Sequence, residues 1–254
     1  MSHLFHLYTK ITTYMAKKKK ADDPQIPELV VDKNPITLLP LKCRNPKQKH
    51  FVSEIRNNDI IICDGIAGSG KTYIALYEGL LGVLGKRYDK LILCKSVIST
   101  PNEDIGYIPG TIEEKMEPHI MSYKGNMKKM LKNEDDVERL FKEKKVEILP
   151  LAYIRGVTLD KAYIIIDESQ NITMDLFKSI ITRIGDDSKM IFLGDIEQVD
   201  FNQDKKRKQS ALQHIIGLFK DESYIGYCHF NDDEVIRNPI IPKVIKKLRD
   251  WAEQ

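Results

Sequence analysis

The chain has 254 residues, of which 42% are hydrophobic and 30% are charged, and its net charge is +3. This length suits one α/β domain with additions or two small domains, and the composition is that of a soluble globular protein. The small positive charge permits a nucleic-acid partner without requiring one. No apolar run reaches the ~20 residues of a membrane-spanning helix, which excludes that class.

The four cysteines, Cys43, Cys63, Cys94 and Cys228, are spread along the chain. None belongs to a C-x-x-C pair, and no histidine lies at the spacing of a zinc ligand, so the pattern does not indicate a zinc site. Cys63 and Cys94 lie in apolar runs and are expected to be small buried residues. The cysteines therefore indicate a reducing compartment, and we predict a cytoplasmic protein.

Residues 1–47 are predicted to form a flexible N-terminal extension, because they hold a lysine run at 17–20, several prolines and little periodicity. Residues 48–254 are predicted to form the folded domain. In chain order, the predicted elements are a helix at 48–57, a strand at 59–63, a helix at 71–84, a strand at 91–94, a loop at 96–112, a helical region at 113–144, strands at 146–149 and 163–166, a helix at 173–184, a strand at 190–193, a basic loop at 202–208, a helix at 209–219, a strand at 224–228 and a helix at 242–253.

Strands that alternate with helices favour an α/β fold, with a mostly parallel sheet covered by helices on both faces. Right-handed crossovers place the carboxyl ends of such strands at one edge of the sheet, where ligands bind. The motifs described below follow predicted strands. We therefore expect them to meet at that edge.

A glycine-rich segment follows the first predicted strand and matches G-x-x-x-x-G-K-[ST] at every position. Its residues are Gly65, Ile66, Ala67, Gly68, Ser69, Gly70, Lys71 and Thr72. Glycines let backbone amides wrap closely around a phosphate, and the dipole of the following helix favours the anion. Lys71 is expected to contact the β- and γ-phosphates, and Thr72 to ligate Mg²⁺. The match predicts a P-loop nucleotide site rather than an ordinary glycine-rich turn.

The apolar run at 163–166 ends in two carboxylates, Asp167 and Glu168. Asp167 is predicted to hold the magnesium ion, and Glu168 to polarise the attacking water. An acidic pair at a strand end is common, and the alternative explanation is a solvated turn. Together with the P-loop, the pair predicts ATP and Mg²⁺ as ligands and ATP hydrolysis as the reaction.

A further predicted strand leads into Asp195 and Gln198. Gln198 is a candidate for sensing the γ-phosphate or positioning the water, and Asp195 for supporting the metal; a capped turn is the alternative. Arg155 and Arg237 are candidates for an arginine that meets charge in the transition state, in cis or from a neighbouring subunit. For each arginine the alternative is a surface ion pair.

Five segments together resemble the PhoH family of P-loop ATPases. They are G-I-A-G-S-G-K-T at 65–72, G-Y-I-P-G-T-I-E-E-K at 106–115, P-L-A-Y-I-R-G-V-T-L at 150–159, I-I-I-D-E-S-Q-N at 164–171 and G-D-I-E-Q-V-D at 194–200. The resemblance covers roughly residues 45–250 and concerns the ATPase domain only. It implies a RecA-like P-loop NTPase fold, similar to the nucleotide-binding core of superfamily-one helicases.

The resemblance also implies individual roles. Gln48 resembles the glutamine that reads adenine, and Gln170 the D-E-x-Q glutamine that is expected near the γ-phosphate. Arg237 is similar to the arginine that contacts the γ-phosphate in those helicases. The sequence departs from the family pattern at Lys95, where arginine is usual, and at Ser169, where alanine is usual.

The favoured hypothesis is ATP hydrolysis coupled to the binding or remodelling of single-stranded RNA or DNA. Basic and aromatic residues near the active edge suit backbone and stacking contacts, although solvated charge and core aromatics also account for them. They are Lys95, Tyr107, His119, Tyr123, Lys124 and the run Lys205-Lys206-Arg207-Lys208.

A single RecA-like core lacks the second core with which a monomeric helicase clamps its strand. We therefore expect a homo-oligomeric ring, such as a hexamer, in which Arg155 is a candidate to act in trans. The alternative function is a nucleotide-dependent switch that assembles with a protein partner. A small-molecule kinase is disfavoured, because Glu168 beside Asp167 favours water as the acceptor.

Overall fold

The computed structural model describes residues 35–95, 112–154, 156–196 and 211–236, together with positions 240, 243, 244, 247 and 251. Residues from Ile36 onward belong to one compact unit. The predicted loops at 96–112 and 202–208 lie almost entirely outside the described residues, and so does most of the predicted helix at 242–253. Within the described residues, every helix is too short or too polar to cross a lipid bilayer.

The described helices and strands alternate, as the sequence predicts. In chain order they are α2 (Pro46–Asn57), β1 (Ile60–Gly65), α3 (Lys71–Leu84), β2 (Lys90–Lys95), α4 (Ile112–Met130), α5 (Asp136–Lys142), β3 (Val146–Ile148), η1 (Leu151–Tyr153), β4 (Ala162–Asp167), η2 (Ser169–Asn171), α6 (Met174–Ile181), β5 (Lys189–Leu193), α7 (Ala211–Phe219), β6 (Gly226–Phe230) and η3 (Asp232–Glu234).

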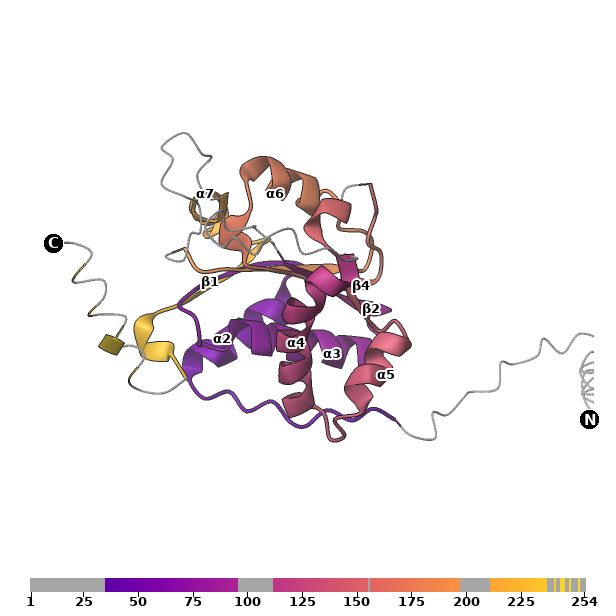
Figure 1. Cartoon of the computed structure of the whole chain (residues 1–254). Helices are drawn as coiled ribbons and strands as arrows, with labels where there is room; N and C mark the ends of the chain where they lie inside the picture. The colour runs from indigo at the N-terminus through magenta and orange to yellow at the C-terminus, as the bar shows by residue number, and fades with distance from the viewer. Residues whose placement is uncertain are drawn as a thin grey trace, which may run out of the picture. The chain divides into compact units, whose positions relative to one another are not determined.

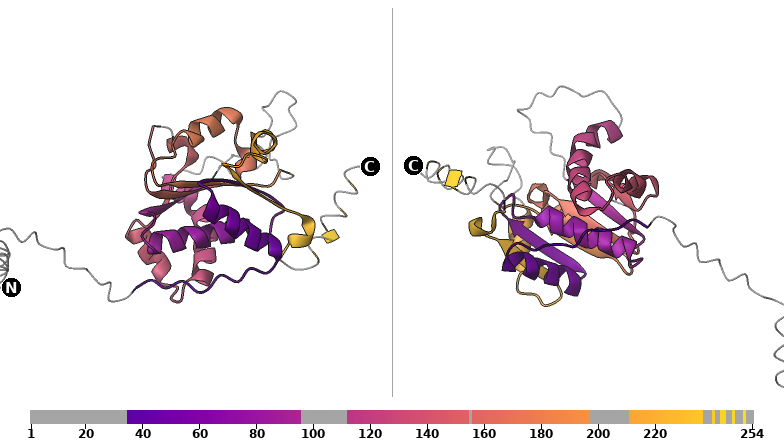
Figure 2. Two further views of the ribbon diagram at one scale, coloured as in Figure 1. Left: turned by 180° about the vertical axis from the view of Figure 1, so that it is seen from behind. Right: turned by 90° about the horizontal axis from the view of Figure 1, so that it is seen from below.

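The six described strands form one sheet in the order β3-β2-β4-β5-β1-β6. Every pairing between neighbouring strands is parallel. Helices α2 to α5 cover one face of the sheet, and α6 and α7 cover the other, as Figure 1 and the two views of Figure 2 show. The predicted α/β fold, with a parallel sheet between two helical layers, is therefore confirmed.

Local sequence explains where α2 begins and why the central strands are buried. The side chain of Asn45 accepts a hydrogen bond from the backbone N–H of Gln48, and Pro46 occupies the first turn of α2. Asparagine caps and a proline in the first turn both favour a helix start. The central strands β1, β4 and β5 are buried on both faces, because their isoleucine-rich runs pack against a helical layer on each side.

The register aligns the tips of the three central strands. Ile62 of β1 pairs with Phe192 of β5, which in turn pairs with Ile166 of β4. Since β5 lies between β1 and β4, the ends of these two strands are about 10 Å apart at the usual strand spacing. The P-loop after β1 and the carboxylates after β4 therefore face each other across the tip of β5.

The helical region predicted at 113–144 divides into two helices. Helix α4 ends at Met130, and the side chain of Asn133 then accepts a hydrogen bond from the backbone N–H of Asp135 before α5 begins. Such an asparagine turn competes with helix continuation. Leu131 leaves the helix and forms a bridge with Leu38 instead.

Residues 36–44 run along the α2–α5 side of the unit, and we call them the arm. The backbone N–H of Leu39 donates to the carbonyl of Met130, and that of Lys132 donates to the carbonyl of Thr37. Ile36, Leu38 and Leu41 are partly buried against the hydrophobic core. Residues 36–44, which fall within the predicted flexible extension of residues 1–47, thus contact the folded unit.

Candidate nucleotide-binding site

The loop between β1 and α3 requires glycine at three positions. Gly65, Gly68 and Gly70 have φ angles of 125°, 88° and 93°, which side chains disfavour. At Gly65 a Cβ atom would lie 2.1 Å from the carbonyl oxygen of Phe230. The loop therefore takes a path into the first turn of α3 that residues with a Cβ atom would disfavour.

Lys71 begins α3, and its side chain is only 9% exposed. Its Nζ donates to the carbonyl oxygens of Gly65 and Ile66, the latter at 2.9 Å. The hydroxyl of Ser69 donates to the same Ile66 oxygen at 2.9 Å. An ammonium group thus lies within the arch of the loop, where phosphate oxygens bind in sites of this kind.

The carboxylate of Asp167 lies at the tip of β4 and receives two hydrogen bonds. The phenol of Tyr123 donates to Oδ2 at 3.0 Å, and the backbone N–H of Glu168 donates to Oδ1 at 3.1 Å. Burial, followed by the neighbouring charge of Glu168, raises the pKa of Asp167 above its ordinary value. Burial also raises the pKa of Tyr123 far above its usual range, so the phenol remains a donor.

Glu168 follows in a left-handed conformation, with φ 55° and ψ 42°, which turns the chain sharply at the strand end. Its Oε2 accepts from Nε2 of Gln170 at 2.8 Å, and its Oε1 lies 3.5 Å from Nζ of Lys95. The buried Gln170 accepts from the backbone N–H of Asp195 at 3.1 Å. Gln170 thereby ties Glu168 to the tip of β5.

Gly194 makes this connection possible, because a Cβ atom there would lie 3.0 Å from the amide oxygen of Gln170 and 2.5 Å from Leu212. Its backbone N–H donates to the carbonyl of Cys63 on β1 at 3.0 Å. The glycine lets the β5 tip approach its neighbours on both sides.

Both polar atoms of the Gln48 side-chain amide form hydrogen bonds within the protein. Its Oε1 accepts from the backbone N–H of Arg44 at 2.7 Å, and its Nε2 donates to the carbonyl of Ser69 at 2.9 Å. The side chain is 3% exposed and lines the pocket described below. Gln48 therefore connects the arm to the P-loop.

Strand β6 and the segment after it are fastened to the P-loop. The buried carboxylate of Asp64 accepts from the phenol of Tyr227 at 3.0 Å and contacts Nδ1 of His229 at 2.9 Å. The backbone N–H of Ile236 donates to the carbonyl of Gly68 at 3.1 Å. The residue that precedes Arg237 is thus bonded directly to the loop, although Arg237 itself lies outside the described residues.

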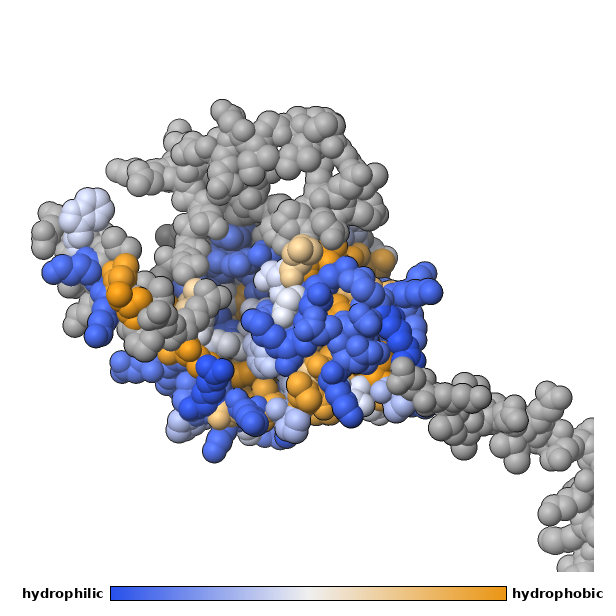
Figure 3. Space-filling model, turned by 60° about the horizontal axis from the view of Figure 1, so that its bottom comes forward, coloured by the Kyte–Doolittle hydropathy of each residue, from blue (hydrophilic) through white to orange (hydrophobic). Residues whose placement is uncertain are grey.

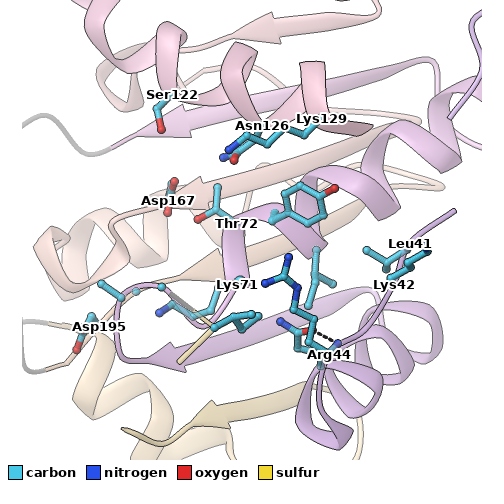
Figure 4. Close-up of a pocket in the computed structure, with 18 of the residues that line it drawn as sticks. Leu41, Lys42, Arg44, Lys71, Thr72, Ser122, Asn126, Lys129, Asp167 and Asp195 are labelled. Carbon is cyan, nitrogen blue, oxygen red and sulfur yellow. Dashed lines mark hydrogen bonds between the residues drawn. The ribbon is translucent and has the colours of Figure 1, made fainter. Parts of the chain in front are cut away.

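Several of these groups line a pocket of about 900 Å³. Its floor is the P-loop and the start of α3, and its other walls come from the arm, from α4 and from the tips of β4 and β5 (Figure 4). Arm residues that line it include Leu41, Lys42 and Arg44. One polar side of α4 also lines it, at Ser122, Asn126 and Lys129.

Thr72 and Asp167 point toward the same region of this pocket (Figure 4). A hydroxyl and a carboxylate oxygen are donors that suit Mg²⁺. Within the described residues, no group of three or more histidine, cysteine or acidic side chains is placed to hold a metal ion. The donor set therefore fits a magnesium ion whose remaining ligands are phosphate oxygens and water.

The structure brings most of the predicted site residues to this one pocket. The P-loop residues Ala67, Gly68, Gly70, Lys71 and Thr72 line it, together with Gln48, Asp167, Glu168 and Asp195. Gln170 stands behind Glu168 and Asp195. Arg155, Gln198 and Arg237 lie outside the described residues.

Two of the residues expected to contact nucleic acid have partners within the protein. Tyr123 is 3% exposed and hydrogen-bonded to Asp167, so it cannot stack on a base. Lys124 pairs with Glu138 and lies over the ring of Phe141. Lys95 lines the pocket and contacts Glu168, which places it in the candidate site.

Sequence reasoning placed Tyr123 near the active edge but missed its contact with Asp167, and it missed the arm as part of the site. Tyr123, Met127 and Met130 recur at helical spacing and are all buried. That periodicity was available in the sequence and indicates a core-facing side of α4. The arm carries no comparable signal, since its contacts with α4 join residues about 90 positions apart, as in the bridge between Leu38 and Leu131.

The PhoH-like protein family matches residues 40–249 of the chain. The PhoH-like proteins of Synechocystis sp. and Bacillus subtilis are 32% and 33% identical to it over 206 residues, which is 81% of this chain and 61% and 63% of theirs. Protein PhoH of Escherichia coli is 30% identical over 208 residues, 81% of this chain and 57% of its own. The chain thus spans about three fifths of the length of these relatives.

Two solved structures show weaker similarity. The large terminase of a thermophilic bacteriophage aligns at a TM-score of 0.46 and 13% identity, over 81% of this chain and 50% of the terminase. Bacteroides sp. Pif1 in complex with ADP-AlF4 aligns at a TM-score of 0.35 and 16% identity, over 83% of this chain and 46% of Pif1. Similarity at this level does not bear on function.

Proposed function

The chain belongs to the PhoH family, and from this premise we propose that it binds ATP with Mg²⁺ and hydrolyses the terminal phosphoanhydride bond. The observation that carries the proposal is the single pocket into which both the P-loop and the β4 carboxylates open. Each partner would be ambiguous alone. Together they line one pocket with hydrogen-bond donors for phosphate oxygens and with ligands for a metal ion.

Each side chain has a role that follows from its place. Lys71 and the loop amides neutralise and orient the β- and γ-phosphates. Thr72 and Asp167 would hold the magnesium ion, which would offset negative charge on the phosphates. Glu168, which accepts a hydrogen bond from Gln170, would orient water toward the γ-phosphate.

The base end of the nucleotide is proposed to lie toward Gln48 and the arm. Gln48 is itself bonded to Arg44 and Ser69, so its contribution includes holding the loop and the arm together. Arg237 is proposed to contact the γ-phosphate, and Gln198 to sense it. Support for Arg237 comes from the hydrogen bond between Ile236 and Gly68.

Replacing Glu168 with glutamine tests the proposed reaction. The variant should bind ATP as the wild type does, while phosphate release falls about 100-fold or more, because the amide cannot accept a proton from water. Glu222→Gln provides the control, since Glu222 is exposed in the turn after α7. Equal turnover in the Glu168 variant and the wild type would remove Glu168 from the proposed mechanism.

We further propose that hydrolysis is coupled to single-stranded RNA or DNA. Support comes from the basic run Lys205–Lys208, which lies outside the described residues, and from exposed Lys42, Arg44 and Lys129 at the rim of the pocket. Cationic side chains beside an ATP site suit a nucleic-acid backbone. Assembly into a ring, with Arg155 acting in trans, is the arrangement we propose for such coupling.

The competing proposal is a nucleotide-dependent switch that recruits a protein. On the α2–α5 side, Figure 3 shows hydrophobic areas interrupted by hydrophilic residues, which does not favour a broad apolar docking surface there. ATP turnover should be measured with and without a single-stranded RNA oligonucleotide and its DNA counterpart. Several-fold stimulation supports nucleic-acid coupling, and absence of binding at low salt supports the switch. Sedimentation with ATP tests assembly.

A further inference from the structure

Tyr123 contacts the carboxylate that is proposed to hold the metal, yet it comes from a different part of the fold. Its hydroxyl donates to Oδ2 of Asp167 at 3.0 Å, and its side chain is 3% exposed. It belongs to α4, which the chain inserts between strands β2 and β3. A buried hydroxyl on one helix thus forms a directed hydrogen bond with the tip of a separate strand, and this bond calls for an explanation.

Core packing determines where this hydroxyl lies. The ring of Tyr123 is buried in the same hydrophobic cluster as Met127, Met130 and the apolar residues of α3. Two turns of α4 are thereby locked against the core. The phenol oxygen is held by the ring and has little freedom to leave Asp167.

The hydrogen bonds leave Asp167 with a defined orientation. Oδ2 accepts from Tyr123, and Oδ1 accepts from the backbone N–H of Glu168 at 3.1 Å. A carboxylate held at both oxygens cannot rotate freely, and each oxygen keeps a lone pair for another partner. Thr72 points toward the same region of the pocket as this carboxylate (Figure 4).

We propose that Tyr123 is a positioning residue that holds Asp167 in the orientation that binds magnesium. The inference rests on the proposed function, because it concerns the same metal ligands. Partners that orient metal ligands through hydrogen bonds typically change metal affinity about 10- to 100-fold when they are removed. Tyr123 itself does not touch the metal or the nucleotide.

The test is Tyr123→Phe, which keeps the buried ring and removes only the hydroxyl. Mn²⁺ replaces magnesium as the probe, and its binding to the protein with a non-hydrolysable ATP analogue is followed by electron paramagnetic resonance. We expect the Mn²⁺ dissociation constant to rise roughly tenfold or more. Affinity for the analogue in EDTA should stay within about twofold, because the P-loop contacts are unchanged.

Tyr163→Phe is the matched control. Tyr163 lies on β4, the same strand as Asp167, and its buried hydroxyl has no hydrogen-bond partner within the described residues. Its removal should leave Mn²⁺ affinity unchanged. A Tyr123→Phe variant that binds Mn²⁺ as tightly as Tyr163→Phe overturns the inference while leaving the proposed function intact. A wild-type protein that binds the analogue but no Mn²⁺ overturns both.

Discussion

Two lysines are buried at opposite ends of the strands of the same sheet, one at the carboxyl edge and one at the amino edge, and their surroundings differ. Lys71 stands at the carboxyl edge, 9% exposed, among glycines and beside the pocket. Lys189 begins β5 at the amino edge, 2% exposed, where its Nζ donates to the carbonyl of Asn58 and lies 4.0 Å from Asp59. Both ammonium groups are held by backbone carbonyls, but only Lys71 of the pair lines the pocket.

A buried cation does not by itself mark a site. At the amino edge the charge is enclosed, and the local chain provides its contacts. At the carboxyl edge the glycines leave amide groups and an ammonium next to open space, and acidic side chains face them from β4. The combination of donors, carboxylates and a cavity distinguishes the candidate site.

The largest expected difference comes from exchanging each lysine for methionine. Lys71→Met should reduce ATP affinity or turnover about 100-fold, because it removes a charge-assisted contact to the phosphates. Lys189→Met should leave both within about twofold, since its contacts lie at the other edge. Calorimetric titration with ATP and a phosphate-release assay measure the two quantities. Similar losses in both variants would contradict the distinction between the edges.

Alanine substitutions of two glycines test how specific the carboxyl-edge loop is. Gly65→Ala should lower the free energy of unfolding by about 3 kcal/mol, because of its positive φ and the contact with the Phe230 carbonyl. Gly125 is exposed on α4 with no atom within 4 Å of an added Cβ, so Gly125→Ala should raise it by about 0.5–1 kcal/mol. Urea denaturation gives both values, and a tolerated alanine at Gly65 would contradict the loop geometry.

A third expectation concerns pH at the amino edge. Burial lowers the pKa of Lys189 from 10.5 to about 8. The folded state therefore binds fewer protons than the unfolded state between these values, so this residue's contribution to stability increases as pH rises from about 8 to 10.5 and is lost below. Relative to Lys189→Met, the free energy of unfolding of the wild type should increase by on the order of 1 kcal/mol per pH unit across that window.

Thermal or urea unfolding of the wild type and Lys189→Met at several pH values checks this expectation. Comparing the two proteins cancels the titration of other groups. A constant difference across the window would show that Lys189 does not change its protonation on unfolding there. ATP binding should not follow the same trend, because Lys189 is remote from the pocket.

Much of the fold was predictable because its signals are local. The apolar runs that precede Gly65 and Asp167 are long enough to indicate buried strands, and all six predicted strands occur within a few residues of their expected positions. The helix break after Met130 was not predicted, because a short asparagine turn and the pairing of Leu131 with Leu38 outweigh the helical pattern.

The sequence alone is enough to recognise a P-loop motif, an acidic strand end and the family to which the chain belongs. A contiguous motif carries its own backbone geometry, and glycine and lysine at fixed spacing need no distant partner to be recognised. Tertiary structure decided the strand order that sets the P-loop opposite Asp167, the hydrogen bond from Tyr123 and the junction of Gln48 with the arm. These depend on contacts between distant residues, which only the packing of the whole core specifies.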